Sequence, residues 1–135
     1  MSELPNSCTR ERMTMDSTEK KILAVDDADI VLHILNVFLR NSQYKLTSAT
    51  SGRTALNFLQ KHSPDLFILD IDMPDMNGYE LAQRIRASGQ TAPIIFLTGN
   101  STEESIIKAL QVGAADFIAK PVCKAKLLER IAKFF

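Results

Sequence analysis

The segment LFILDIDMPDMNGYEL (Leu66–Leu81) combines a short apolar run, an aspartate directly after that run, and a turn that leads into an amphipathic stretch. Its first four residues, Leu66–Leu69, are continuously apolar, which is typical of a strand covered on both faces. Beyond the turn at Asn77-Gly78, Leu81 and Ile85 have the spacing of one helical face. The segment therefore predicts a buried strand followed by Asp70, and then a helix.

The same unit recurs along the rest of the chain. Further apolar runs lie at Ile22–Val25, Leu46–Ala49, Ile94–Leu97 and Phe117–Ala119. The stretches after the runs have apolar residues at helical spacings of three and four. These residues are Ile30, Ile34, Val37 and Phe38; Ala55, Leu56 and Leu59; Ile106, Ile107 and Leu110; and Leu127, Leu128, Ile131 and Phe134. Ser101-Thr102 before Glu103-Glu104 indicates a helix start. Alternating strands and helices with short links predict an α/β fold, a (βα)5 three-layer sandwich around a parallel five-stranded sheet.

Length and composition narrow the class of protein. A chain of 135 residues has room for one domain of ordinary size, and 45% hydrophobic residues exclude wholesale disorder. Residues 1–19 follow neither a helical nor a strand period, so we expect a flexible tail followed by one domain over residues 20–135. Equal numbers of basic and acidic residues, 16 each, argue against binding nucleic acid by bulk charge attraction.

The sequence also bears on the compartment. No apolar run approaches the roughly 18 residues that a membrane-spanning helix needs, and the N-terminus lacks the apolar core of a signal peptide. Cys8 and Cys123 are far apart and have no metal-binding spacing, so reduced thiols are expected rather than a disulfide or a zinc site. We therefore expect a soluble, cytoplasmic protein that does not bind membranes.

Residues that can do chemistry directly follow four of the predicted strands: Asp26 with Asp27, Asp70, Thr98 and Lys120. The carboxyl ends of parallel strands share one edge of a sheet, where ligands bind in open α/β folds. Each residue alone could be a helix cap or a surface residue, but together they predict a site. Close carboxylates need a cation to remain ionised, and their hard oxygens suit Mg²⁺. A lysine and a hydroxyl beside them can bind a phosphoryl group.

Four segments resemble the receiver domains of two-component response regulators: KILAVDD (Lys21–Asp27), PDLFILDIDMPDMNGYEL (Pro64–Leu81), PIIFLTG (Pro93–Gly99) and GAADFIAKP (Gly113–Pro121). The resemblance extends from Lys20 to Phe135. It implies a flavodoxin-like, doubly wound sheet with strand order 2-1-3-4-5, the order that is standard for this fold. It also implies a phosphorylated switch rather than a turnover enzyme. A histidine kinase or phosphotransfer protein would supply the phosphoryl group. Because no output module follows Phe135, the chain is expected to be either a stand-alone regulator or the receiver of a longer protein.

The resemblance implies roles for the residues at the strand ends. Asp70 would accept the phosphoryl group. Asp26, Asp27 and Asp70, with the backbone carbonyl of Asp72, would hold Mg²⁺ or Mn²⁺. Lys120 would pair with the phosphoryl oxygens, and its bond to the following proline would be cis.

Further residues would respond to phosphorylation. Thr98 would move its hydroxyl onto the phosphoryl group, and Phe117 would turn inward to fill the space that Thr98 leaves. Asp72 and Asn100 would modulate the phosphoryl group, Asp72 by changing its lifetime. The last two helices and the last strand would form a surface for a homodimer, an output domain or a downstream protein. Its basic amphipathic stretch contains Lys124, Lys126, Arg130 and Lys133.

Two alternatives remain open. The string LFILDID also fits haloacid-dehalogenase-like phosphohydrolases, in which Asp70 would be the nucleophile and Asp72 the acid/base. Chain order argues against this reading, because that family has its acidic pair last and here Asp26 and Asp27 come first. The other alternative is a non-phosphorylated pseudo-receiver that only binds partners, and the complete set of site residues argues against it.

Overall fold

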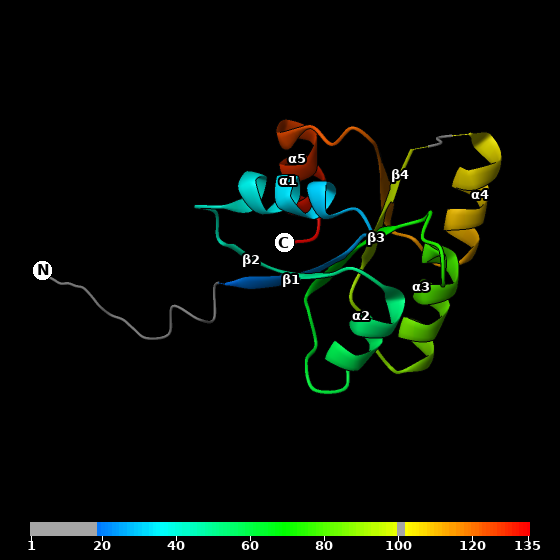
Figure 1. The fold of residues 1–135 in the computed structure, drawn as a ribbon. Coiled ribbons are helices and arrows are strands. Elements are labelled where there is room, and N and C mark those ends of the chain that lie inside the picture. Colours follow the sequence, from blue (N-terminus) through cyan, green and yellow to red (C-terminus); the bar gives the residue numbers. More distant parts are fainter. Residues whose placement is uncertain (1–18, 100–101) are drawn as a thin grey trace, which may run out of the picture.

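The structure, a computed structural model, describes residues 19–99 and 102–135 and contains five strands that alternate with five helices (Figure 1). The strands are β1 (Lys20–Val25), β2 (Tyr44–Ala49), β3 (Leu66–Asp70), β4 (Ile94–Thr98) and β5 (Asp116–Ala119). The helices are α1 (Asp29–Leu39), α2 (Gly52–Phe58), α3 (Gly78–Ala87), α4 (Glu103–Gln111) and α5 (Lys124–Ala132). Each apolar run that the sequence marked as a strand lies within one of these strands. Most of the predicted tail, and Asn100, lie outside the described residues.

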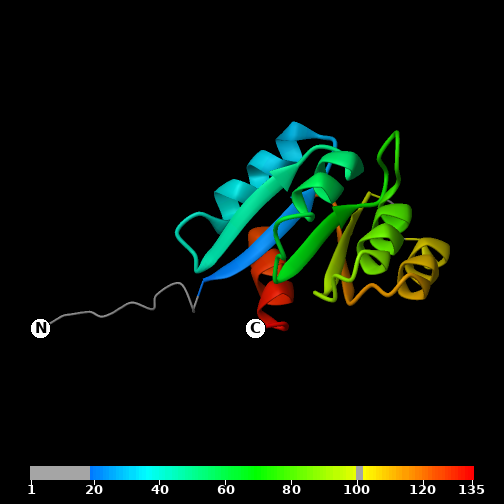
Figure 2. The same ribbon diagram turned by 90° about the horizontal axis from the view of Figure 1, so that it is seen from below.

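All neighbouring strands pair in parallel, and the sheet order is β2-β1-β3-β4-β5. Helices α1 and α5 cover one face of the sheet, and α2, α3 and α4 cover the other (Figures 1 and 2). The three-layer α/β fold and the expected strand order are therefore confirmed. The order reverses between β1 and β3, so the carboxyl ends of these two strands flank the crevice where doubly wound folds bind ligands.

Two hydrophobic clusters, one on each face of the sheet, form the core. Alternate residues of each strand point to opposite faces. In β3, Phe67 and Leu69 join the cluster under α2, α3 and α4, while Leu66 and Ile68 join the one under α1 and α5. All four side chains are fully buried. The continuous apolar run of β3 is thus explained by helices on both faces, and its following residue, Asp70, is held rigidly at the sheet edge.

The predicted buried faces of α1 and α4 are wrong. In α1 the buried residues are Leu32, Leu35 and Leu39, whereas Ile30, chosen from the sequence as part of the inner face, is 65% exposed. The segment DIVLHILNVFL has apolar residues on nearly all sides, so spacing alone does not single out one face. In α4 the only buried residue is Ala109, while Ile107 and Leu110 are exposed. The small side chain of Ala109 is the one that joins the hydrophobic cluster on this face of the sheet.

The described residues also show the character of the helices, the state of one cysteine and the start of α4. Within residues 19–99 and 102–135, no helix has the length and apolar character needed to span a membrane. Cys123 is a free, exposed thiol, and Cys8 lies outside the described residues. The predicted start of α4 is confirmed, because the Thr102 side chain accepts a hydrogen bond from the backbone N–H of Ser105.

Candidate functional site

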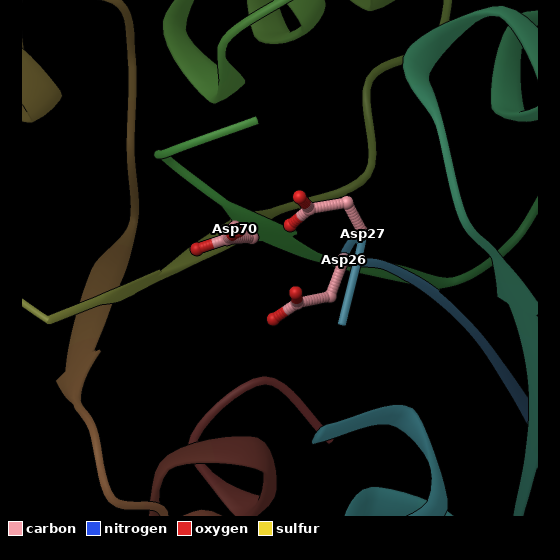
Figure 3. Close-up of side chains that lie close together, drawn as sticks. All are labelled: Asp26, Asp27 and Asp70. Carbon is pink, nitrogen blue, oxygen red and sulfur yellow. The ribbon is translucent and has the colours of Figure 1, made fainter. Parts of the chain in front are cut away.

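Three carboxylates converge at the carboxyl edge of the sheet. Asp26 and Asp27 follow β1, and Asp70 is the last residue of β3, the strand that pairs with β1. One carboxylate oxygen from each residue lies within 4.8 Å of the others. Figure 3 shows the three side chains directed toward a common space. Asp26 and Asp70 are buried, whereas Asp27 is exposed, so the cluster is open to solvent on the Asp27 side.

A single ammonium group joins the two buried carboxylates. Lys120, which directly follows β5, places Nζ 3.0 Å from Asp70 Oδ1 and 3.1 Å from Asp26 Oδ2. The contact with Asp70 is a well-aligned hydrogen bond. The contact with Asp26 is an ion pair only, since the buried Oδ2 accepts no aligned hydrogen bond from any described residue. The other oxygen, Asp26 Oδ1, accepts the backbone N–H of Ala28 at 2.9 Å.

The surroundings of Asp70 disfavour its negative charge. Burial, together with the neighbouring charge of Asp26, raises the pKa of Asp70 to about 6, although the hydrogen bond from Lys120 and the backbone of Asp72 oppose this rise. Burial acts to lower the pKa of Lys120, but its hydrogen bond to Asp70 and the negative charges of Asp26 and Asp70 outweigh burial, so the pKa of Lys120 is raised. One lysine therefore does not fully compensate the carboxylates, and the site still favours a further cation.

The donor set fits a hard divalent cation. Asp26 Oδ2 is a buried acceptor with no aligned hydrogen bond, directed into a cluster of three carboxylates. Oxygen ligands from a few carboxylates, with positions left for water and substrate oxygens, are what Mg²⁺ prefers. Such an ion would also stabilise the ionised form of Asp70. These residues therefore fit Mg²⁺ or Mn²⁺.

Thr98 and Phe117 lie on neighbouring strands beside this cluster. Thr98 is the last residue of β4 and is buried, and it pairs in register with Ala119 of β5. Phe117 is half-buried and packs against the hydrophobic cluster under α2, α3 and α4. The peptide bond between Lys120 and Pro121 is cis, as the family resemblance implied.

Asp72 lines a cleft of about 430 Å³, which is also lined by Ile71, the residue that follows Asp70. Its side chain is exposed, and it lines the cleft together with Thr98, Tyr79 and Lys108. Asp72 is thus near the site but is not one of the three clustered carboxylates.

Two residues near the site were not singled out from the sequence. A Cβ atom added to Gly78 would lie 2.3 Å from the carbonyl oxygen of Asp70, so only glycine allows α3 to begin this close to β3. Its N–H donates to the carbonyl oxygen of Ile71 at 2.8 Å. Tyr79, the next residue, reaches across to α4. The Asn77-Gly78 turn in the sequence indicated a special position at Gly78. The contact of Tyr79 had no such signal, because it depends on the distance between α3 and α4.

Comparison with known proteins agrees with this geometry. Residues 22–132 match the response regulator receiver domain family. The chain belongs to this family. It is 36% identical over 121 residues to a probable transcriptional regulatory protein of Picosynechococcus, with 84% of this chain and 48% of that protein covered. It is 34% identical over 110 residues to the response regulator SaeR of Staphylococcus aureus, with 82% and 48% covered. The receiver chain thus spans about half the length of these curated relatives.

A solved structure gives the same result for the fold. The chemotaxis protein CheY4 of Vibrio cholerae is 31% identical, with a TM-score of 0.82, and the alignment covers 87% of this chain and 99% of that one. The chain is therefore a receiver domain of a two-component response regulator, in a family of signalling switches rather than turnover enzymes. Family membership removes the phosphohydrolase alternative that Asp70 and Asp72 had left open.

Proposed function

We propose that Asp70 accepts a phosphoryl group from a phosphohistidine of a histidine kinase or phosphotransfer protein in a reaction that requires Mg²⁺. The observation that carries the proposal is the buried Asp26 oxygen without an aligned hydrogen bond, within a cluster of three carboxylates and one lysine. This cluster offers a metal site and a nucleophile at the same point. Asp26, Asp27, Asp70 and the backbone carbonyl of Asp72 would hold the ion.

Asp70 and Lys120 would have different roles in the phosphoryl transfer. An oxygen of Asp70 attacks phosphorus, and the P–N bond to the donor imidazole breaks, so the electron pair of that bond leaves with the imidazole, which is then protonated. A bound Mg²⁺ supplies neutralisation of charge on the attacking carboxylate and the phosphoryl oxygens. Lys120, already 3.0 Å from Asp70, moves its hydrogen bond to a phosphoryl oxygen. The rigid backbone of β3 keeps Asp70 in line with the incoming group.

The same residues would convert the covalent change into a structural one. The phosphoryl group adds negative charge where carboxylates already lie, and the hydroxyl of Thr98 at the same edge can donate to it. If Thr98 moves toward Asp70, the half-buried ring of Phe117 on the neighbouring strand can move into the released space. This pair would then act as a two-state element read at the surface of α4, β5 and α5.

Asp72 and Asn100 complete the proposal as modulating residues. The exposed carboxylate of Asp72, two residues after the acceptor, would change the lifetime of the phosphoryl group by orienting or repelling water. Comparing the dephosphorylation rate of an Asp72→Ala variant with that of the wild type tests this, and an equal rate would refute it. The role of Asn100 stays a prediction from the sequence.

The partners and the location are part of the same proposal. A cytoplasmic histidine kinase domain or phosphotransfer protein would be the donor, and an output domain or a downstream protein would read the switch. The exposed side chains of Ile107 and Leu110 on α4 favour a homodimer through α4, β5 and α5. The zero net charge of the chain argues against direct contact of this domain with nucleic acid.

The decisive test is covalent labelling with a small phosphodonor. Incubation with acetyl phosphate or phosphoramidate and Mg²⁺ should add one phosphoryl group, seen by intact-mass spectrometry, and chelation of the metal should prevent it. Asp70→Asn should abolish the labelling, whereas Asp75→Asn, a change in the exposed loop nearby, should not. Labelling that persists in Asp70→Asn would refute the acceptor assignment. No labelling of the wild type would favour the pseudo-receiver alternative.

A further inference from the structure

Helix α4 has the fewest buried residues of the helices in the described part of the chain. Of its nine residues only Ala109 is buried, whereas each other helix buries at least two residues. Its two largest apolar side chains on the outer side, Ile107 and Leu110, are 49% and 60% exposed. Because so little of α4 lies in the core, a few individual contacts can determine its position.

Tyr79 makes two of these contacts from the first turn of α3. Its hydroxyl donates a hydrogen bond of 3.1 Å to the carbonyl oxygen of Ser105 in the first turn of α4. The ammonium group of Lys108, one turn further along α4, lies 4.9 Å from the centre of the Tyr79 ring. The ring is itself fixed, because it is buried and meets Phe96 of β4 edge-on with the ring centres 5.5 Å apart. Tyr79 thus connects α4 to a rigid part of the core.

This connection lies next to the phosphorylation site. The cleft of about 430 Å³ is lined by Tyr79, Ser105 and Lys108 together with Asp72 and Thr98. Burial, and the negative charge of Asp72, raise the pKa of Tyr79, so its hydroxyl remains protonated and available as a donor. A rearrangement at Thr98 or Asp72 would therefore reach the hydrogen bond between Tyr79 and α4 directly.

The hydrogen bond between Tyr79 and Ser105 occurs together with a direct contact between Lys120 and Asp70. Lys120 donates directly to Asp70 Oδ1, a contact that belongs to a free carboxylate. A phosphoryl group on Asp70 would change this contact, because the lysine would then pair with phosphoryl oxygens. The Tyr79–Ser105 hydrogen bond is thus present together with a direct contact between Lys120 and Asp70.

We propose that the Tyr79 hydroxyl is a latch that holds α4 against α3 while Asp70 is unmodified, and that phosphorylation of Asp70 releases it. The inference rests on the proposed role of Asp70. Coupling between two sites is reciprocal, so a latch that phosphorylation releases must also oppose phosphorylation to the same extent. Release of α4 would change how Ile107 and Leu110 are presented to a partner.

The test compares two variants that lose the same atom. Tyr79→Phe removes the hydroxyl but keeps the ring that contacts Phe96 and Lys108. Tyr44→Phe, in β2, is the matched control, because it changes the chain's other tyrosine, whose ring lies against Phe135. The readout is the dissociation constant of beryllofluoride with Mg²⁺, an acyl-phosphate mimic, measured by calorimetry. Loss of one hydrogen bond of ordinary net strength should tighten binding roughly two- to tenfold in Tyr79→Phe and leave Tyr44→Phe like the wild type.

Hydrogen exchange without beryllofluoride tests the latch independently of Asp70. Tyr79→Phe should speed exchange of the α4 amides severalfold while α1 and α5 remain as in the wild type. Acceleration spread evenly over the chain would show that Tyr79 only stabilises the fold, and would overturn the latch. Equal or weaker beryllofluoride binding by Tyr79→Phe would overturn it as well. A wild-type chain that does not bind beryllofluoride at all would instead overturn the proposed function, and the regulatory part of this inference with it.

The control variant also provides a direct probe. The chain has no tryptophan and two tyrosines, so Tyr79 is the only tyrosine left in Tyr44→Phe. Its near-ultraviolet absorption then reports the hydrogen bond of its hydroxyl. Addition of beryllofluoride and Mg²⁺ should shift this band as the phenol loses the Ser105 carbonyl. An unchanged band, with beryllofluoride shown to be bound, would overturn the release of the latch.

Discussion

Replacing Asp70 with asparagine should stabilise the metal-free protein, and the gain should depend on pH. Burial and the charge of Asp26 raise the pKa of Asp70 from 3.8 to about 6. The folded state therefore binds a proton more tightly than the unfolded state does, and the free energy of unfolding falls as the pH rises from about 4 to about 6. Each pKa unit corresponds to about 1.4 kcal/mol, so the penalty at neutral pH is about 3 kcal/mol at most. Because Asp70→Asn also weakens the hydrogen bond from Lys120, we expect a net gain of about 1–3 kcal/mol.

Urea unfolding in the presence of a chelator, repeated between pH 4.5 and pH 8, measures this gain. The difference in unfolding free energy between Asp70→Asn and the wild type should grow as the pH rises to about 6 and stay constant above about 7. Saturating Mg²⁺ is the control. The bound ion stabilises the wild type with its ionised carboxylate, so the advantage of the variant should shrink or reverse. A difference that is the same at pH 4.5 and pH 7.5 without metal would refute the reasoning.

Three further predictions concern single positions. Gly78→Ala should cost roughly 1–3 kcal/mol of stability, because the new Cβ would meet a backbone oxygen at 2.3 Å, and it should slow phosphorylation by moving the acceptor. Gly99→Ala should be near neutral in urea unfolding, because no atom of the described residues, chain neighbours aside, lies within 4 Å of the new Cβ. Asp26→Asn should weaken Mg²⁺ binding in calorimetry by at least about tenfold, since even outer-shell partners of a metal show losses of that size. Asp29→Asn, an exposed change in the first turn of α1, should leave Mg²⁺ binding nearly unchanged. Cys123 should be alkylated by iodoacetamide with a pH midpoint below that of a thiol in an unstructured peptide, because N–H groups at the start of α5 lower its pKa.

The convergence of the site residues could be predicted from the sequence because topology alone determines it. Asp26, Asp70 and Lys120 are far apart in the chain, but each follows a parallel strand, and the ends of such strands share one edge. The distances and the burial could not be predicted in the same way. That Lys120 would contact two carboxylates, and that one oxygen of Asp26 would have no aligned hydrogen bond, depends on side-chain positions of a few ångströms.

The errors occurred where packing between elements decides the outcome. The inner face of α1 was misassigned because Ile30 and Leu32 are both apolar, and only the rotation of the helix about its own axis decides which of them faces the sheet. The role of Tyr79 had no local signal, since its hydroxyl bonds a carbonyl 26 positions further along the chain. Spacing within one helix contains no information about the distance to the next helix, so such contacts require the structure.

The charge of the site explains why the neutral composition of the chain is compatible with a cation-dependent function. The chain has 16 basic and 16 acidic residues, yet among the described residues the cluster contains three carboxylates and one ammonium group. When all are ionised, two negative charges remain, which is the charge that one divalent cation compensates. The proposed phosphorylation would replace the single charge of Asp70 with a phosphoryl group of about −2. One divalent cation would then no longer compensate the negative charge of the site. Groups that can move toward Asp70 would have to restore the balance. A site balanced in this way responds to the chemical change by rearrangement, which is the behaviour required of a switch.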